Sequence, residues 1–171
     1  MARIHAETAY QNALAYVYAL IRGSEYARAI AEMTQAGGQR LAPAFRHDGN
    51  HSWYVIGDAF CKMGDYSAAA QAFRRALRCW PGDGEALMAL GNSYSETQRP
   101  KLAARCLRKA IPLSPKRAAD CRFNLGNALF DMQNYEAAAA EYAAAAATGG
   151  KKTAAKARKM LARLGVDTKG D

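Results

Sequence analysis

The stretch that decides the fold is residues 51–115, HSWYVIGDAFCKMGDYSAAAQAFRRALRCWPGDGEALMALGNSYSETQRPKLAARCLRKAIPLSP, whose second half repeats the pattern of its first. In the first half the patterned positions are Trp53, Ile56, Gly57, Phe60, Gly64, Tyr66, Ala69, Phe73, Ala76 and Pro81. In the second half they are Leu87, Leu90, Gly91, Tyr94, Ala103, Leu107, Ala110 and Pro115. Corresponding positions such as Gly57 and Gly91 lie 34 residues apart, a period that predicts stacked helix pairs.

The spacing within one copy has a physical meaning. A large residue, an Ile–Gly pair and an aromatic residue recur on one face of a first helix. Gly57 carries no side chain, so a second helix can approach it closely. On that second helix, small alanines flank Phe73 and leave room for one large side chain. Pro81 cannot continue a helix and therefore ends the unit.

Taken together, these positions resemble the tetratricopeptide repeat (TPR) family. A third copy of the pattern follows at Leu125, Gly126, Leu129, Tyr135, Ala138, Tyr142 and Ala145. The resemblance implies an all-α fold, a short right-handed α-solenoid of about three helix pairs. It also implies a concave groove that binds a peptide or a protein.

The later copies depart from the family pattern in four places. One residue is inserted between the second and third copies, and we place it within residues 115–117. In the third copy Arg122 replaces the large first residue, and Gly150 stands where proline is expected. In the second copy Pro100 replaces the aromatic residue of the turn. Proline is tolerated in the first turn of a helix, but the aromatic packing is lost there.

The chain is therefore expected to divide into five segments. They are a degenerate N-terminal helical hairpin with a loop (1–49), three repeats (50–83, 84–118 and 119–150), and a basic capping helix with a tail (151–171). Within the repeats we expect helices at 51–63, 66–79, 84–97, 100–112, 119–132 and 135–147.

The N-terminal segment carries only part of the pattern. Residues 6–21 are apolar nearly all round, which predicts a helix buried on more than one side. Tyr26, Ala29, Met33 and Ala36 echo the second helix of a repeat. Residues 37–50 predict an irregular loop with Leu41 and Phe45 against the next repeat, or alternatively a mobile lid over the groove.

The capping helix is expected at 151–164 and is amphipathic. Its predicted apolar side holds Ala154, Ala155, Met160, Leu161 and Leu164. Its predicted solvent side holds Lys152, Lys156, Lys159 and Arg163. A terminal repeat needs such a polar-faced cap to cover its open end.

Composition limits the function classes. Lysine and arginine outnumber aspartate and glutamate by 24 to 15, a net charge of +9 that suggests acidic partners. The four cysteines, Cys61, Cys79, Cys106 and Cys121, form no C-x-x-C pair, so we expect reduced thiols and a cytoplasmic location. No metal and no cofactor is expected. The longest apolar run is too short to span a bilayer.

Catalytic signatures are missing from the sequence. It holds no Gly-rich phosphate loop and no nucleophile motif. The acids Asp58, Glu85, Asp120 and Asp131 show no spacing that would pair two of them across a scissile bond. We therefore expect no catalytic residues and a protein that is not an enzyme.

The resemblance places the partner-binding residues on the first helix of each repeat, along the concave groove. The chosen contact residues are Tyr54, Asp58, Met88, Asn92, Phe123, Asn127 and Phe130. Aromatic and methionine side chains supply contact area, and the acids of these helices favour a basic or amphipathic peptide. The alternative is an ordinary polar surface.

Basic residues cluster on the second helices, which the resemblance places on the convex side. They are Arg74, Arg75, Arg78, Arg105, Arg108 and Lys109. Alanine and leucine flank them in place of aromatic residues, which disfavours nucleic acid as a partner. The basic residues fit better with a solvated face, with an acidic protein partner or, more weakly, with a membrane surface.

The leading hypothesis is a non-enzymatic adaptor or scaffold that holds a peptide or helix of a partner in its groove. The alternatives are a self-assembling scaffold, which would be a homo-oligomer, and a chaperone of the export type. One TPR subclass clamps a C-terminal carboxylate with Lys and Asn. Asn92 and Asn124 match two of its positions and Arg158 approaches a third, but Met88 stands where the clamp has Lys.

Overall fold

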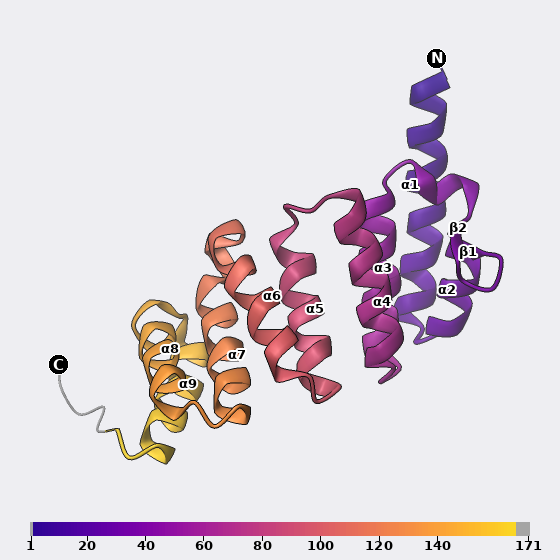
Figure 1. Ribbon diagram of the computed structural model, residues 1–171. Coiled ribbons are helices and arrows are strands. Elements are labelled where there is room, and N and C mark those ends of the chain that lie inside the picture. Colours follow the sequence, from indigo (N-terminus) through magenta and orange to yellow (C-terminus); the bar gives the residue numbers. More distant parts are fainter. Residues whose placement is uncertain (1, 167–171) are drawn as a thin grey trace. The chain divides into compact units, whose positions relative to one another are not determined.

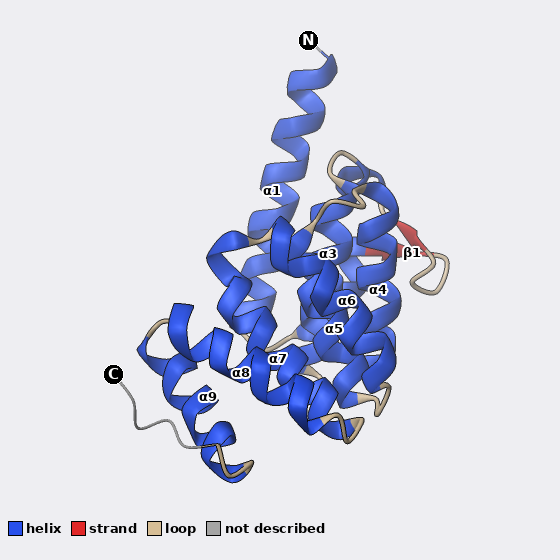
Figure 2. Ribbon diagram, turned by 60° about the vertical axis from the view of Figure 1, so that its left-hand side comes forward, coloured by secondary structure: helices blue, strands red, loops and turns tan. Residues whose placement is uncertain are grey.

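The computed structural model describes residues 2–166, with side chains from residue 5, in two compact units (Figures 1 and 2). Unit 1, Met1–Pro81, contains α1 (Ala2–Arg22), α2 (Tyr26–Met33), β1 (Thr34–Gln35), β2 (Arg40–Leu41), the 3₁₀ turn η1 (Pro43–Arg46), α3 (Gly49–Lys62) and α4 (Tyr66–Cys79). Unit 2, Gly82–Asp171, contains α5 (Gly84–Glu96), α6 (Pro100–Leu113), the 3₁₀ turn η2 (Pro115–Arg117), α7 (Ala118–Asp131), α8 (Tyr135–Thr148) and α9 (Lys151–Arg163). Within each unit consecutive helices pack on one another, which confirms the predicted all-α fold of helix pairs. The predicted tail beyond Val166 lies outside the described residues.

The helices of the repeats begin and end within two residues of the predicted spans. Local chemistry fixes several of their starts. The side chains of Asp48, Asp65, Asp83 and Asn134 each accept a hydrogen bond from the backbone N–H three residues later, at 2.9–3.2 Å. Each bond satisfies one donor that the first helical turn leaves without an intrahelical partner.

The glycine of each first helix is required by close packing, as predicted. A Cβ atom added to Gly57 would lie 2.5 Å from the Phe73 ring of α4. A Cβ atom at Gly126 would lie equally close, 2.5 Å, to the Tyr142 ring of α8. Phe73 and Tyr142 are 1% and 0% exposed, so neither ring has room to move away.

The N-terminal segment differs from its prediction between residues 34 and 46. Helix α2 ends at Met33, so Ala36 is not helical and instead has a φ of 51°. β1 and β2 form a short antiparallel hairpin that pairs Thr34 with Leu41. The predicted irregular loop is therefore a hairpin followed by a 3₁₀ turn. The burial of Leu41 is confirmed, at 7% exposed.

Helix α1 also differs, because it buries one stripe and not its whole circumference. The buried residues are Tyr10, Leu14, Val17 and Leu20. Tyr10 meets Phe45 edge-on with 6.4 Å between ring centroids, which places the predicted buried Phe45 against α1. Tyr16 and Tyr18 are 44% and 36% exposed, so these two tyrosines lie outside the buried stripe.

Unit 2 accommodates two of the departures from the repeat pattern, Pro100 and Arg122. Pro100 occupies the first turn of α6, where its missing N–H costs no helical hydrogen bond, as predicted. Arg122 forms an ion pair with Glu141 of α8, Nη1 to Oε2 at 3.1 Å. An ion pair thus replaces the apolar contact of the large residue in the first copy.

Helix α9 covers the end of the array as a cap. It packs on α8 and, more lightly, on α7, and it buries Ala154, Ala157 and Leu161. Gly149 precedes it in extended conformation. A Cβ atom there would lie 2.6 Å from the Ala145 carbonyl oxygen, so the close turn into α9 requires glycine.

Candidate partner-binding surfaces

In unit 1 the predicted contact residues Tyr54 and Asp58 lie on α3 and are half-buried. The Tyr54 ring rests on Phe73, with 5.5 Å between centroids. Asp58 Oδ2 lies 3.6 Å from Lys62 Nζ, one helical turn away. Both Tyr54 and Asp58 keep part of their surface open to a partner.

The loop that was a candidate lid contacts other residues of α3 and α4. The Phe45 carbonyl accepts a hydrogen bond from Ser52 Oγ at 2.9 Å, and the Gly38 carbonyl accepts one from Arg75 Nη1 at 2.7 Å. These contacts anchor both ends of the segment to α3 and α4.

In unit 2 three asparagines organise the surface of the first helices. Asn124 Nδ2 on α7 donates a hydrogen bond to Asn92 Oδ1 on α5 at 2.8 Å. Asn127 Oδ1 accepts a hydrogen bond from the Tyr142 hydroxyl at 2.8 Å. The α8 tyrosine therefore fixes the orientation of Asn127 from beneath. All three asparagines remain half-buried, with polar edges available for further hydrogen bonds.

Two aromatic rings lie on the same face of α7, and a cation from α9 lies over each. Phe123, Asn127 and Phe130 are spaced four and three residues apart, which places them on one helical stripe. Lys156 Nζ lies 5.9 Å from the Phe123 ring centroid. Arg163 Cζ lies 5.1 Å from the Phe130 ring centroid. Both distances allow a cation–π attraction.

Both cations are exposed, as predicted for the solvent side of the capping helix. Their long stems also let the charged groups lie near the two rings of α7. Thr153 of α9 reaches the same helix, because its Oγ1 donates a 2.5 Å hydrogen bond to Asp120 Oδ1. Lys156 and Arg163 follow Phe123 and Phe130 by 33 residues, the separation of Thr153 and Asp120. That spacing is the sequence signal that could have placed them.

We name this region of unit 2 the amide–ring surface. It consists of Asn92, Asn124, Asn127, Phe123, Phe130, Lys156 and Arg163. Within the described residues neither Lys156 nor Arg163 forms an ion pair. Asp120, one of the acids expected in the groove, is held instead by Arg117, whose Nε lies 2.9 Å from its Oδ2. The local charge is therefore more basic than the sequence predicted.

Met88 was a predicted contact residue, and the structure corrects this. It is 7% exposed and belongs to the core of unit 2. The repeat offset identified its helix correctly, but Met88 lies on the buried side of α5 beside Leu87 and Leu90. It therefore offers almost no contact area to a partner.

The predicted basic residues of the second helices are exposed with one exception. Arg74 and Arg78 in unit 1, and Arg105, Arg108 and Lys109 in unit 2, face solvent. Arg75 does not, because its guanidinium lies over the Trp53 ring, with Cζ 4.5 Å from the ring centroid. Arg75 is therefore part of the packing between α3, α4 and the hairpin.

Other kinds of site find little support in the part of the chain that the structure describes. No group of three or more His, Cys, Asp or Glu side chains there is arranged to hold a metal ion. None of the four cysteines, all of which lie in the described part, forms a disulfide bond, and Cys79 is the exposed one. Burial raises the pKa of the Cys121 thiol to about 11, with the nearby Glu85 and Asp120 adding to the effect. Between residues 2 and 166, no helix is long and apolar enough to cross a membrane.

Comparison with known families agrees with this geometry. Two family models, each described as a tetratricopeptide repeat, match residues 54–118 and 119–147, together more than half of the chain. The chain belongs to the tetratricopeptide repeat family. No curated protein gives a significant match to the sequence.

Solved TPR structures share the fold at low sequence identity. MamA (residues 41 to the end) from Desulfovibrio magneticus RS-1 is 19% identical with a TM-score of 0.75, over 92% of this chain and 86% of that one. YrrB, described as a TPR protein with an unusual peptide-binding site, is 22% identical with a TM-score of 0.67, over 91% and 78%. The first TPR of Spaghetti, bound to an HSP90 peptide SRMEEVD, is 17% identical with a TM-score of 0.60, over 68% and 94%.

Proposed function

We propose that this TPR protein is a non-enzymatic, cytoplasmic interaction module whose amide–ring surface binds an extended peptide segment of a partner protein. The TPR fold is a protein-interaction fold, and one of its solved neighbours is bound to an HSP90 peptide. The observation that carries the proposal is the Asn92–Asn124 pair beside two rings and two cations. Amide side chains suit hydrogen bonding to an extended backbone, and rings supply apolar contact.

The proposed partner segment combines apolar and acidic side chains. Lys156 and Arg163 contact aromatic rings and no carboxylate within the described residues, so an incoming carboxylate meets two uncompensated cations. The charge of the proposed partner is therefore opposite to that of the basic peptide that the acids of the first helices suggested. The peptide bound by the neighbour Spaghetti is also rich in acidic residues, which supports the same polarity.

Charge reversal on α9 tests the proposal. The variant K156E/R163E should weaken binding of a short fluorescent peptide of apolar and acidic residues about tenfold or more, because it opposes like charges. The matched control is K152E/K159E, which changes the net charge equally at two exposed positions on the same helix. A second peptide with Lys in place of each acid should bind the parent chain weakly.

Two results would contradict the proposal. One is equal loss of binding in K152E/K159E, which would indicate a diffuse charge effect. The other is preference of the parent chain for the lysine peptide. Sedimentation over a range of concentrations separates the alternatives, because a self-assembling scaffold grows with concentration. Co-purification of an unfolded client would instead favour the export-chaperone alternative.

A further inference from the structure

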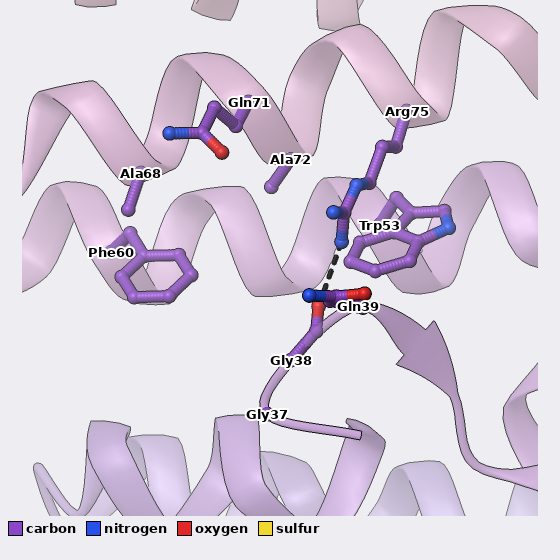
Figure 3. Close-up of a pocket in the computed structure, with 9 residues that line it drawn as sticks. All are labelled: Gly37, Gly38, Gln39, Trp53, Phe60, Ala68, Gln71, Ala72 and Arg75. Carbon is purple, nitrogen blue, oxygen red and sulfur yellow. Dashed lines mark hydrogen bonds between the residues drawn. The ribbon is translucent and has the colours of Figure 1, made fainter. Parts of the chain in front are cut away.

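Unit 1 contains a cavity of about 350 Å³ between the β1–β2 hairpin and the helices α3 and α4 (Figure 3). It lies next to the β1–β2 hairpin, which follows α2 in place of the longer helix that the sequence predicted. Trp53 and Phe60 of α3 line it from one helix, and Ala72 of α4 from the other. The walls therefore combine aromatic and aliphatic side chains with the polar backbone of the hairpin. The side-chain amides of Gln39 and Gln71 add hydrogen-bonding groups.

Arg75 is the charged residue that lines this cavity. Its Nη1 donates to the Gly38 carbonyl at 2.7 Å, and its guanidinium stacks on Trp53 at 4.5 Å. Figure 3 shows the guanidinium above the hairpin backbone, with Trp53 to one side and Ala72 and Gln71 to the other. The stack and the single bond hold its planar group in a fixed orientation.

The remaining donors of Arg75 have no partner among the residues that the structure describes. Within the described residues Nη1 is the guanidinium nitrogen that donates a hydrogen bond, and no carboxylate approaches within ion-pair distance. Nε and Nη2 present two parallel N–H groups, the fork that matches the two oxygens of a carboxylate. No aspartate or glutamate lines the cavity, so its charge is uncompensated and positive.

We infer that this cavity binds a carboxylate carried on a small apolar body, such as an aromatic or branched aliphatic acid. Arg75 would pair with the carboxylate, and the walls formed by Phe60, Trp53 and Ala72 would contact the apolar part. A volume of about 350 Å³ is near the lower end for ligand sites, so a single side chain or a small acid fits. The acid is either a free small molecule or the C-terminal residue of a polypeptide. The site is separate from the amide–ring surface and does not depend on it.

The tryptophan in the wall gives a direct assay. The chain has two tryptophans, and Trp80 is 58% exposed, so W80F leaves Trp53 as the single fluorescent reporter. Titration with N-acetylphenylalanine should change Trp53 fluorescence along a saturable curve. Its neutral amide should bind about tenfold more weakly or worse, because it cannot form a charged pair with Arg75. A peptide that ends in phenylalanine tests the polypeptide source, and the same peptide with an amidated end is its control.

Two further variants locate the binding. R75Q should abolish the fluorescence response, whereas R74Q, which removes the same charge from the adjacent exposed arginine, should leave it intact. A68L retains Arg75 but fills the cavity from α4, so it should also block binding, even if R75Q fails to fold. The inference is overturned if the acid and its amide bind equally, if R74Q and R75Q behave alike, if A68L binds normally, or if no probe gives a saturable response.

Discussion

Asn124 on α7 donates its side-chain amide to the amide oxygen of Asn92 on α5, at 2.8 Å. The two residues belong to consecutive repeats, so the bond joins the two first helices at the surface of unit 2. A few residues along α7, Asn127 accepts a hydrogen bond from the fully buried Tyr142 at the same distance, 2.8 Å. The three amides are thereby held in place before any partner binds, which lowers the entropic cost of recognition.

The two hydrogen bonds differ in burial, so we predict that removing each one lowers the free energy of unfolding by a different amount. N124A removes a bond between half-buried groups and should lower the free energy of unfolding by about 0.5–1.5 kcal/mol. N127A leaves the buried Tyr142 hydroxyl without its acceptor and should cost more, about 1–3 kcal/mol. Urea unfolding followed by circular dichroism measures both. A larger loss of unfolding free energy in N124A than in N127A would contradict this prediction.

The glycine of the first helix should not tolerate a methyl group. G57A and G126A each place a Cβ atom 2.5 Å from a buried ring, which should destabilise the protein by about 1–3 kcal/mol. The matched control is G150A, where an added Cβ has no neighbour within 4 Å. Thermal unfolding should show a clear loss for the first two variants and little change for the third. A tolerated G57A would mean that Phe73 has room to move.

The Arg122–Glu141 ion pair should contribute little to stability. Their side chains are 36% and 24% exposed, and such partly exposed pairs contribute about 0–1 kcal/mol. R122L/E141A restores the apolar contact of the other repeats and should be at least as stable as the parent chain. R122L alone should be less stable than the double variant, because it leaves Glu141 without its cation. Chemical denaturation of the three proteins checks this order, and a markedly unstable double variant would contradict it.

The buried thiol of Cys121 predicts a loss of stability at alkaline pH. Its pKa is about 11 in the folded chain, raised from an ordinary 9.0, so the unfolded chain ionises first. The contribution is fully present below about pH 9 and is lost as the pH rises toward about 11. The midpoint of thermal unfolding should therefore fall across this range, and it should fall less steeply in C121A. Identical slopes for the two proteins would show that the thiol is not responsible.

The repeats could be predicted from the sequence because all three copies carry the same pattern of packing residues. Gly57 and Gly126 each face one large residue of a second helix, at the same offset within their repeats. The hairpin at 34–41 has no copy elsewhere in the chain. Its turn depends on Ala36, Gly37 and Gly38 at φ values of 51°, 64° and 84°, and a single Gly–Gly pair does not reveal such a conformation.

The sequence could predict which helices carry the candidate site, but not the direction of every side chain on them. The repeat offsets identified Asn92, Phe123 and Phe130 on the first helices. They did not reveal that Met88 is buried, because an offset gives a position on the helix and not what packs against it. Lys156 is exposed, as its place on the polar side of an amphipathic helix predicts. The helical pattern does not reveal that its flexible stem also carries the ammonium group over an aromatic ring of the neighbouring helix.

The central claim is that the amide–ring surface of unit 2 binds a peptide with apolar and acidic side chains. Nuclear magnetic resonance of the ¹⁵N-labelled chain tests it most directly, by following side-chain amide signals as such a peptide is added. We predict that the signals of Asn92, Asn124 and Asn127 shift together and saturate, while signals near Arg105 and Arg108 on α6 stay in place. Shifts confined to the α6 arginines, with the three asparagines unchanged, would contradict it.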